Sequence, residues 1–318
     1  MVLPAQHLLC RVGVLKRGNS MTDQELAKIA NEVRRGIVTG VHAAKSGHPG
    51  GSLGAADIMT YLYFEEMDVD PANPSRAERD RFVLSKGHCA PALYAVLAER
   101  GFFPKEELET LRHIGSRLQG HPNMNDTPGV DMSTGSLGQG ISAAVGMALA
   151  AKHWGDSYRV YTLLGDGECE EGQVWEAAMF AGNHDLDNLV AIVDHNGLQI
   201  DGSIDEVNSA MPLADKFRAF KWHVIELADG NDMAQIAAAF AEARKVSASP
   251  VAIIAETVKG KGVSFMENQV GWHGKAPNDE QFEQAMAELA AAGESSNGRR
   301  QKVATRVSYG QGTCRAGQ

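Results

Sequence analysis

Apolar residues follow two alternating patterns along most of the chain. Positions that repeat every three or four residues predict amphipathic helices, and these fall at Asp23–Ala44, Ala55–Met67, Ala90–Arg100, Leu137–Trp154, Val174–Gly182, Met233–Lys245 and Asn278–Ala292. Short apolar runs predict buried strands, and these fall at Arg81–Leu84, Val160–Leu164, Leu189–Val193, His223–Leu227 and Val251–Glu256. Strands that alternate with helices in this way predict an α/β fold, in which helices cover both faces of a parallel sheet.

The two ends of the chain lack these patterns. Residues 1–21 carry basic side chains, no acid and no periodic apolar face, so we expect an extension outside the fold. The segment is a poor secretory signal because it has no sustained apolar stretch, and a weak transit peptide because it is poor in serine. Thr22 and Glu25 have the spacing of a capping box, so we expect a domain over residues 22–292. Residues 293–318 are polar and rich in Gly, Ser and Arg, which predicts a flexible tail.

Composition narrows the class of protein. The chain has 318 residues, of which 43% are apolar and 22% charged, as in ordinary globular proteins. A formal net charge of −10 argues against a nucleic-acid partner, which would need a basic face. We expect no membrane span, because no apolar stretch approaches the necessary length. The 4 cysteines are scattered without a CxxC pair, which predicts neither a zinc site nor a disulfide framework and fits a cytoplasmic protein.

Polar residues follow two of the predicted strands. Gly165-Asp166-Gly167 comes directly after one strand, and Asn196 closes the next strand along the chain. If these strands are parallel neighbours, their carboxyl ends meet at the edge where such sheets bind ligands. Asp166 and Asn196 would then share a hard cation such as Mg²⁺, which also holds substrate phosphates. A plain turn is the simpler interpretation of Gly-Asp-Gly alone, whereas an EF-hand is excluded because Glu171 and Ala177 stand where its Gly and final Glu would be.

Several histidines stand in loops that are rich in Gly and Pro. His48, His88, His121 and His273 all occur in this way, and loop ends on a rigid scaffold are where binding residues concentrate. A surface histidine is the simpler interpretation of each one alone, but together they suggest a polar pocket that handles hydroxyls, phosphates and protons. The simpler interpretation is kept for His7, His42, His113, His153, His184, His195 and His223.

The segment 135–140 is rich in glycine but does not match the GxGxxG dinucleotide fingerprint. It opens a predicted helix, whose free backbone amides would approach a ligand. Gly135 in this segment would allow close contact between the backbone and that ligand.

Taken together, these segments resemble the N-terminal, thiamine diphosphate-binding half of transketolase. The shared motifs lie between Asp23 and Leu289 and are highly specific in combination: SGHPGGSLGAAD from Ser46, RDRFVLSKGHCAPALYA from Arg79, STGSLGQGISAAVGMA from Ser133, GDGECEEGQVWEA from Gly165, DHNGLQIDG from Asp194, then GKGVSFMEN and WHGKAPND. A complete transketolase is a longer chain with a second thiamine-handling domain and a C-terminal domain, which are absent from this sequence. The resemblance therefore implies the thiamine diphosphate-binding fold and the N-terminal subunit of a split transketolase.

The resemblance also implies roles for individual residues around the cofactor. It makes Asp166 and Asn196 side-chain ligands of Mg²⁺, with the backbone carbonyl of Leu198 as a third ligand. The other cofactor contacts that it implies are Gly167, His88 and His273 at the diphosphate, Gly135 and Leu137 at the aminopyrimidine, and Ile200 in the wall that bends the cofactor.

For catalysis, the resemblance implies transfer of a two-carbon ketol unit from a ketose phosphate to an aldose phosphate, as in the pentose phosphate pathway. His48 and His121 would face the substrate, His273 would stand at the mouth of the site, and Glu171 would belong to a carboxylate network that crosses the subunit interface. The Glu that activates the cofactor's amino group belongs to the absent half. We therefore expect activity only with a C-terminal partner subunit, in a heterotetramer with two copies of each chain.

Three alternatives stay open at the level of sequence. The first is another thiamine diphosphate enzyme, such as the α subunit of a 2-oxo acid dehydrogenase or a deoxyxylulose phosphate synthase, although SGHPGG, SKGH and WHGKAP favour transketolase. The second is a non-catalytic subunit that holds the cofactor. The third is a transketolase of narrow specificity for an unusual sugar phosphate.

Overall fold

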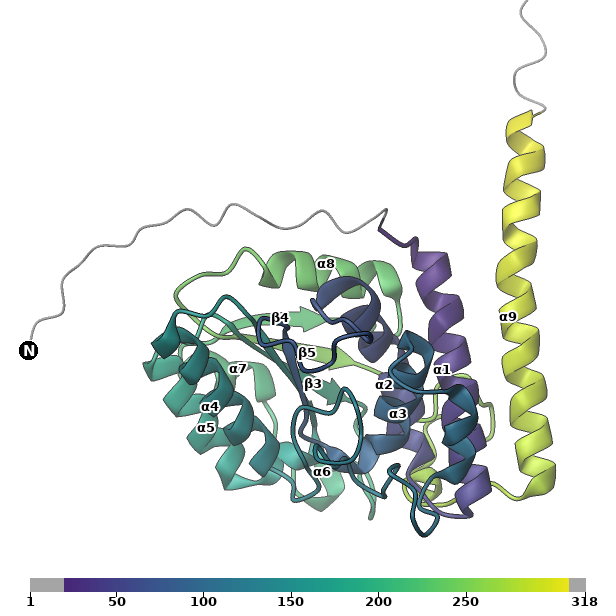
Figure 1. The fold of residues 1–318 in the computed structure, drawn as a ribbon, viewed down its shortest axis with the longest axis horizontal. Helices are drawn as coiled ribbons and strands as arrows, with labels where there is room; N and C mark the ends of the chain where they lie inside the picture. Colours follow the sequence, from purple (N-terminus) through teal and green to yellow (C-terminus); the bar gives the residue numbers. More distant parts are fainter. Residues whose placement is uncertain (1–19, 309–318) are drawn as a thin grey trace, which may run out of the picture.

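The computed structural model describes residues 20–308, and its centre is a five-stranded parallel sheet (Figure 1). The strands lie in the order β1-β2-β3-β5-β4, and each neighbouring pair is parallel. Their bounds are β1 Arg81–Leu84, β2 Val160–Gly165, β3 Leu189–His195, β4 His223–Leu227 and β5 Val251–Glu256. The predicted α/β class and all of the predicted strands are confirmed, with β2 and β3 running slightly further than expected.

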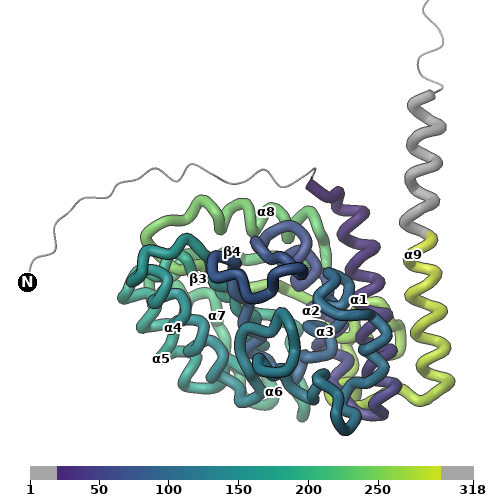
Figure 2. The backbone as a smooth tube through the Cα atoms, viewed as in Figure 1, coloured from purple at the N-terminus to yellow at the C-terminus, as the bar shows by residue number. Residues whose placement is uncertain are grey.

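The sheet is buried on both faces, which is why its strands appear in the sequence as apolar runs. Successive residues of β2 point to opposite sides. Tyr161 and Leu163 pack into one apolar cluster with α1, α2, α3 and α8, and Val160 and Leu164 pack into a second cluster with α4, α5 and α7. The two groups of helices lie on opposite sides of the sheet (Figures 1 and 2).

Each predicted helix is present, and α1 and α3 have the predicted bounds. Those that cover the sheet are α1 Asp23–Ala44, α2 Pro49–Tyr61, α3 Ala90–Arg100, α4 Gln139–Trp154, α5 Gly172–Asn183, α7 Leu213–Ala219 and α8 Met233–Ala243. The short α6 (Ile204–Val207) and α7 were not predicted, because one or two helical turns carry too few residues to show a periodic pattern. No helix within residues 20–308 is long and apolar enough to cross a membrane.

The start of α2 differs most from the prediction. The sequence pattern predicts a helix from Ala55, whereas α2 begins at Pro49 inside the SGHPGG motif and continues into a π-helical turn over Leu62–Glu66. Every residue of α2 is buried, so it has no polar face and its amphipathic signal is absent. Pro49 suits the first turn of a helix, where its missing N–H costs nothing. His48, just before it, is thereby fixed at a helix N-terminus.

The last helix, α9 (Asp279–Ser308), extends beyond its predicted end at Ala292. It packs along α1, where the Asn31 side-chain amide donates to the carbonyl of Leu289 at 2.9 Å. The tail predicted for residues 293–318 is therefore helical at its start, and its remainder lies outside the described residues. At the other end, the Met21 amide donates to Glu65 at 2.7 Å, so Met21 belongs to the domain. Residues 1–19 of the predicted extension lie outside the described part.

Candidate cofactor and active site

The tips of β2 and β3 bring the predicted cation ligands together. β2 and β3 are parallel neighbours in which Gly165 lies opposite Asp194, so Asp166 and Asn196 follow adjacent strand ends. The Asp166 carboxylate is 3% exposed and accepts backbone hydrogen bonds from Gly167 at 2.8 Å and Gly197 at 2.6 Å. Burial and then the nearby Asp194 carboxylate raise the pKa of Asp166, and the two amides act in the opposite direction. A cation bound at this carboxylate would likewise stabilise its charged form.

The donor set at these strand ends fits a small divalent cation. Asp166 offers a carboxylate, Asn196 a side-chain amide and Leu198 a backbone carbonyl, all of which are hard oxygen ligands of the kind Mg²⁺ prefers. The Leu198 carbonyl also accepts a hydrogen bond from Lys259 Nζ at 2.9 Å, so this oxygen already faces positive charge. Within the described residues no three His, Cys, Asp or Glu side chains group as metal ligands. The three oxygen donors named above would fill part of an octahedral coordination sphere, and phosphate oxygens would fill more of it.

A cavity of about 280 Å³ opens beside these strand ends. The predicted site residues that line it are His48, His88, Gly135, Leu137, Asp166, Gly167, Asn196, Leu198, Ile200 and His273. Two predicted residues do not line it. His121 lies next to it, with its ring centre 6.5 Å from that of His48. Glu171 is exposed and stands at the start of α5.

Three histidines form a tight group in the cavity. The ring centres of His48, His88 and His273 lie between 5.2 and 5.5 Å from one another. Burial and then the charge of Arg112 lower the pKa of His48 to about 4, and burial and then Lys259 lower the pKa of His273 to about 3. Burial also lowers the pKa of His88 well below its usual value. All three imidazoles are thus neutral near pH 7, and each offers one donor and one acceptor.

The hydrogen bonds of these histidines leave atoms for a ligand. Lys259 Nζ lies 3.1 Å from His273 Nδ1, and an ammonium can only donate, so His273 carries its proton on Nε2. His48 Nδ1 is buried without any hydrogen-bond partner among the described residues. Buried polar atoms are normally satisfied, so this atom indicates that a polar ligand completes the site.

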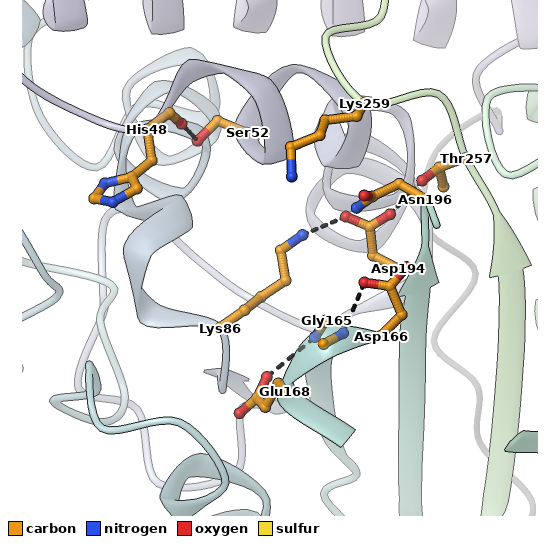
Figure 3. A network of polar contacts seen from close by, with 12 residues as sticks. His48, Ser52, Lys86, Gly165, Asp166, Glu168, Asp194, Asn196, Thr257 and Lys259 are labelled. Atoms are coloured by element: carbon orange, nitrogen blue, oxygen red, sulfur yellow. Dashed lines mark hydrogen bonds and ion pairs between the residues drawn. The ribbon is translucent and has the colours of Figure 1, made fainter. Parts of the chain in front are cut away.

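Two buried lysines near the cavity were not predicted from the sequence. Lys86, 1% exposed, forms an ion pair with Asp194, which also accepts a hydrogen bond from the Thr257 hydroxyl (Figure 3). Burial is the largest influence and would lower the pKa of Lys86, but Asp194, Cys89 and Asp166 together outweigh it, so the net pKa is raised. Burial and then Lys86 lower the pKa of Lys259. Lysine is almost never fully buried unless it is paired. The only signals in the sequence were the SKGH motif, which contains Lys86, and the position of Lys259 directly before the GKG motif.

Glu168 was not predicted either, although it lies within the GDGECEEG motif. Its carboxylate accepts hydrogen bonds from the Ser85 hydroxyl at 2.5 Å, the Gly138 amide at 2.9 Å and the Gly165 amide at 3.0 Å. Burial raises the pKa of Glu168, although each of these three hydrogen bonds lowers it. Glu168 therefore joins the end of β1, the glycine-rich segment and the end of β2, and Figure 3 shows its contact with Gly165. Glu168 is buried and forms part of the cavity wall, whereas Glu171 is exposed at the surface.

Oxygen donors, buried ammonium groups and neutral histidines gather at the carboxyl edge of the parallel sheet, which is where domains of this α/β class bind their ligands. Residues 26–308 match the family model described as transketolase, thiamine diphosphate binding domain. The chain belongs to the transketolase family. The family, the thiamine diphosphate-binding domain and the transferase class predicted from the sequence are confirmed.

The relatives include both separate subunits and longer enzymes. The 6-deoxy-6-sulfo-D-fructose transketolase subunit SqwG of Clostridium sp. strain MSTE9 is 47% identical over 86% of this chain and 100% of its own length. One subunit of the apulose-4-phosphate transketolase of Phocaeicola vulgatus is 45% identical over 81% of this chain and 91% of that protein. This chain matches these separate subunits over nearly their whole length. The prediction that it is a transketolase subunit is therefore confirmed.

Longer transketolases contain this chain as a part. Rat transketolase is 45% identical over 84% of this chain, which corresponds to 42% of the rat protein. The crystal structure of Campylobacter jejuni transketolase superposes with a TM-score of 0.79 at 34% identity, over 85% of this chain and 43% of that one. The chain thus spans less than half the length of these relatives and corresponds to their thiamine diphosphate-binding part.

Proposed function

We propose that this chain binds thiamine diphosphate and Mg²⁺ and, with a C-terminal partner subunit, transfers a two-carbon ketol unit from a ketose phosphate to an aldose phosphate. The observation that carries the proposal is the cavity at the β2 and β3 tips, where oxygen donors, lysines and neutral histidines converge. When bound, thiamine diphosphate supplies the nucleophile and electron sink for cleavage of a carbon–carbon bond.

The residues of this chain would orient and balance the charge of the cofactor. Asp166, Asn196 and the Leu198 carbonyl would hold the cation, and the ammonium groups of Lys86 and Lys259 would offset the remaining negative charge of the diphosphate. Buried charges act strongly because the surrounding dielectric is low. The Gly167 amide, which donates to Asp166 in the structure, would turn to the diphosphate.

The histidines would serve the substrate as well as the cofactor. We assign His88 and His273 to the diphosphate end, and His48 and His121 to the hydroxyl groups of the sugar. A neutral imidazole can hold a hydroxyl proton and then release it, which is the proton transfer that ketol transfer requires. Gly135, Leu137 and Ile200 would form the wall against the cofactor rings. Ile200 is 66% exposed in this chain, so this wall would be completed by the partner.

The surface of α4 and α5 supports the proposed partner. Trp154 and Leu149 on α4, and Met179 and Phe180 on α5, are exposed apolar side chains on helices that lie side by side (Figure 1). Apolar side chains gathered on one face mark interaction surfaces. Glu171 stands at the start of α5, so its carboxylate would lie beside that interface. We propose two copies of each chain, in the cytoplasm, where the buried free thiols of Cys89 and Cys169 would stay reduced.

Reconstitution tests this function. The full chain should be mixed with its candidate partner, thiamine diphosphate and Mg²⁺, and assayed across a panel of ketose and aldose phosphates. We expect ketol transfer from the mixture and almost none from this chain alone. A mixture that forms a complex, binds the cofactor and transfers nothing from any donor would favour a non-catalytic role.

A second candidate is a transketolase of narrow specificity. The relatives that match from end to end are named for 6-deoxy-6-sulfo-D-fructose and apulose 4-phosphate, so related subunits act on modified sugars. Both compounds therefore belong in the substrate panel. A kcat/KM for one of them at least about 100-fold above that of every ordinary ketose phosphate would establish the narrow function.

A further inference from the structure

Arg112 lies close to both histidines that we assign to the sugar, and no carboxylate within the described residues forms an ion pair with it. Its side chain is half-buried, and its guanidinium donates a hydrogen bond to the Ser46 hydroxyl. Arg117, in the same loop, forms an ion pair with Glu107 at 2.6 Å. Arg112 therefore keeps a positive charge that nothing nearby balances.

The backbone at Arg112 is held in an uncommon conformation. Its φ of +60° lies in the left-handed region, which costs a residue other than glycine roughly 1 kcal/mol or more. The Arg112 amide donates to the Leu118 carbonyl at 2.8 Å, and Leu118 is fully buried, so the loop is anchored in this shape. Such an outlier, kept by its surroundings, is a reason to look for a functional role.

The guanidinium joins the two loops that carry the histidines. Nη1 donates to the Ser46 hydroxyl at 2.9 Å, two residues before His48. The same group lies flat against Gly120, the residue before His121, so closely that a Cβ on Gly120 would come within 3.1 Å of the guanidinium carbon. One side chain therefore sets the positions of the segments that lead into His48 and His121.

The charge of Arg112 acts on both rings. After burial, Arg112 is the strongest influence that lowers the pKa of His48, and the same holds for the pKa of His121. The titratable groups that face His48 are Arg112, His121, Lys259, His88 and His273. His121 faces Arg112 and His48. None of these groups is an acid, so among the described residues these neighbours do not oppose the effect of Arg112 on the two imidazoles.

We propose that Arg112 is a positioning residue of the sugar end of the site: it couples the His48 loop to the His121 loop and makes the electrostatic potential between them positive. Both imidazoles are thereby kept as neutral groups that can accept a hydroxyl proton. The expected effect of Arg112 on the reaction rate rests on the proposed ketol transfer. Its expected effect on the two imidazoles does not, because this effect can be measured in the chain without substrate.

The electrostatic side is tested by NMR titration of the histidines in the full chain without substrate. Signals would be assigned with His48→Gln and His121→Gln. Arg112→Gln should raise the pKa of both histidines by roughly half a unit or more, because a nearby cation disfavours the charged imidazole. Arg112→Lys keeps the charge and should leave both values close to wild type. Arg117→Gln removes an arginine of the same loop that is paired with Glu107, and should change neither value.

The positioning side is tested by kinetics of the reconstituted complex. Arg112→Lys and Ser46→Ala should each lower kcat/KM several-fold without changing cofactor affinity, because the link between the loops is lost. Arg112→Gln should lower kcat/KM about 10-fold or more and shift the acid limb of its pH profile to higher pH.

The outcomes separate this proposal from the proposed function. Unchanged histidine pKa values in Arg112→Gln, with kinetics equal to those of Arg117→Gln, would overturn the role of Arg112. If Arg112→Gln fails to fold, Arg112→Lys and Ser46→Ala decide, and wild-type kcat/KM in both would overturn it. A wild-type complex without any ketol transfer, but with the expected change in histidine pKa on Arg112→Gln, would refute the proposed function and leave the electrostatic role standing.

Discussion

The end of the cavity that we assign to the diphosphate and the end that we assign to the sugar differ in how many of their polar groups have partners within this chain. At the diphosphate end, Lys86, Asp194 and Thr257 form a closed network, and Glu168 has three hydrogen-bond donors. At the sugar end, His48 Nδ1 has no partner, Arg112 has no counter-charge among the described residues, and His121 is exposed.

The difference shows which part of the site a single chain can build. Paired buried charges fix the diphosphate end without help, since breaking such a pair would cost several kcal/mol. Among the described residues, the sugar end has an unsatisfied nitrogen, an unpaired guanidinium and an exposed imidazole. A substrate and a second chain would supply their partners. We therefore infer that this chain forms the diphosphate-binding part of the site by itself, and that it forms the sugar-binding part only together with a second chain.

The largest effect is expected at the cation ligands. Asp166→Ala or Asn196→Ala should weaken Mg²⁺-dependent binding of thiamine diphosphate by about 100-fold or more, because a hard oxygen ligand is lost from a buried site. Asp205→Ala is the control, since Asp205 is an exposed acid on α6. Calorimetry on the complex would measure the affinities, and wild-type affinity in both site variants would refute the cation assignment.

Separating the histidines would sharpen the comparison of the two ends. His88→Ala and His273→Ala should weaken cofactor binding by about 10-fold, whereas His48→Ala and His121→Ala should mainly lower kcat or raise KM for the sugar. His223→Ala serves as the control because its ring lies at the surface, beside Glu242. Small effects of all four site substitutions, similar to that of the control, would refute the assignment of these histidines to the cofactor and the sugar.

Acid should destabilise the fold through the buried histidines. The pKa of His48 is about 4 in the folded chain and near 6.5 when unfolded, so the unfolded state binds more protons between these values. Stability is therefore present above pH 6.5 and falls as the pH drops towards 4. Between pH 7 and pH 5, wild type should lose about 1 kcal/mol more than His48→Gln, after allowance for solvent screening. Urea unfolding measures this, and equal losses in the two proteins would contradict it.

Removal of the N-terminal extension should have the smallest effect. A chain that starts at Met21 keeps the capping box of Thr22 and Glu25 and the contact of Met21 with Glu65. We expect its melting temperature and its assembly with the partner to match those of the full chain. A fall in melting temperature of more than about 4 °C, which corresponds to more than about 1 kcal/mol in a protein of this size, would show that residues 1–20 contribute to the fold.

Sequence patterns predicted the sheet and the diphosphate end better than the details of the site. The central strands β2, β3 and β5 were recognisable because a parallel strand buried on both faces is apolar along its length. Asp166 and Asn196 followed from adjacent strand ends. The start of α2 was not recognisable, because a helix buried all round has no polar face. Lys86 and Glu168 were missed for a related reason: their burial depends on partners distant in sequence, Asp194 for the lysine and Ser85 and Gly138 for the glutamate.

The central claim, that this chain by itself grips the diphosphate, is tested most directly by comparing two ligands on the full chain alone. Thiamine diphosphate and thiamine would be titrated separately by calorimetry with Mg²⁺ present, and inorganic diphosphate would be added as a competitor. We predict that thiamine diphosphate binds at least about 10-fold more tightly than thiamine, that inorganic diphosphate displaces it, and that chelation of Mg²⁺ removes the difference. Equal affinity for the two ligands, unaffected by inorganic diphosphate, would contradict the account.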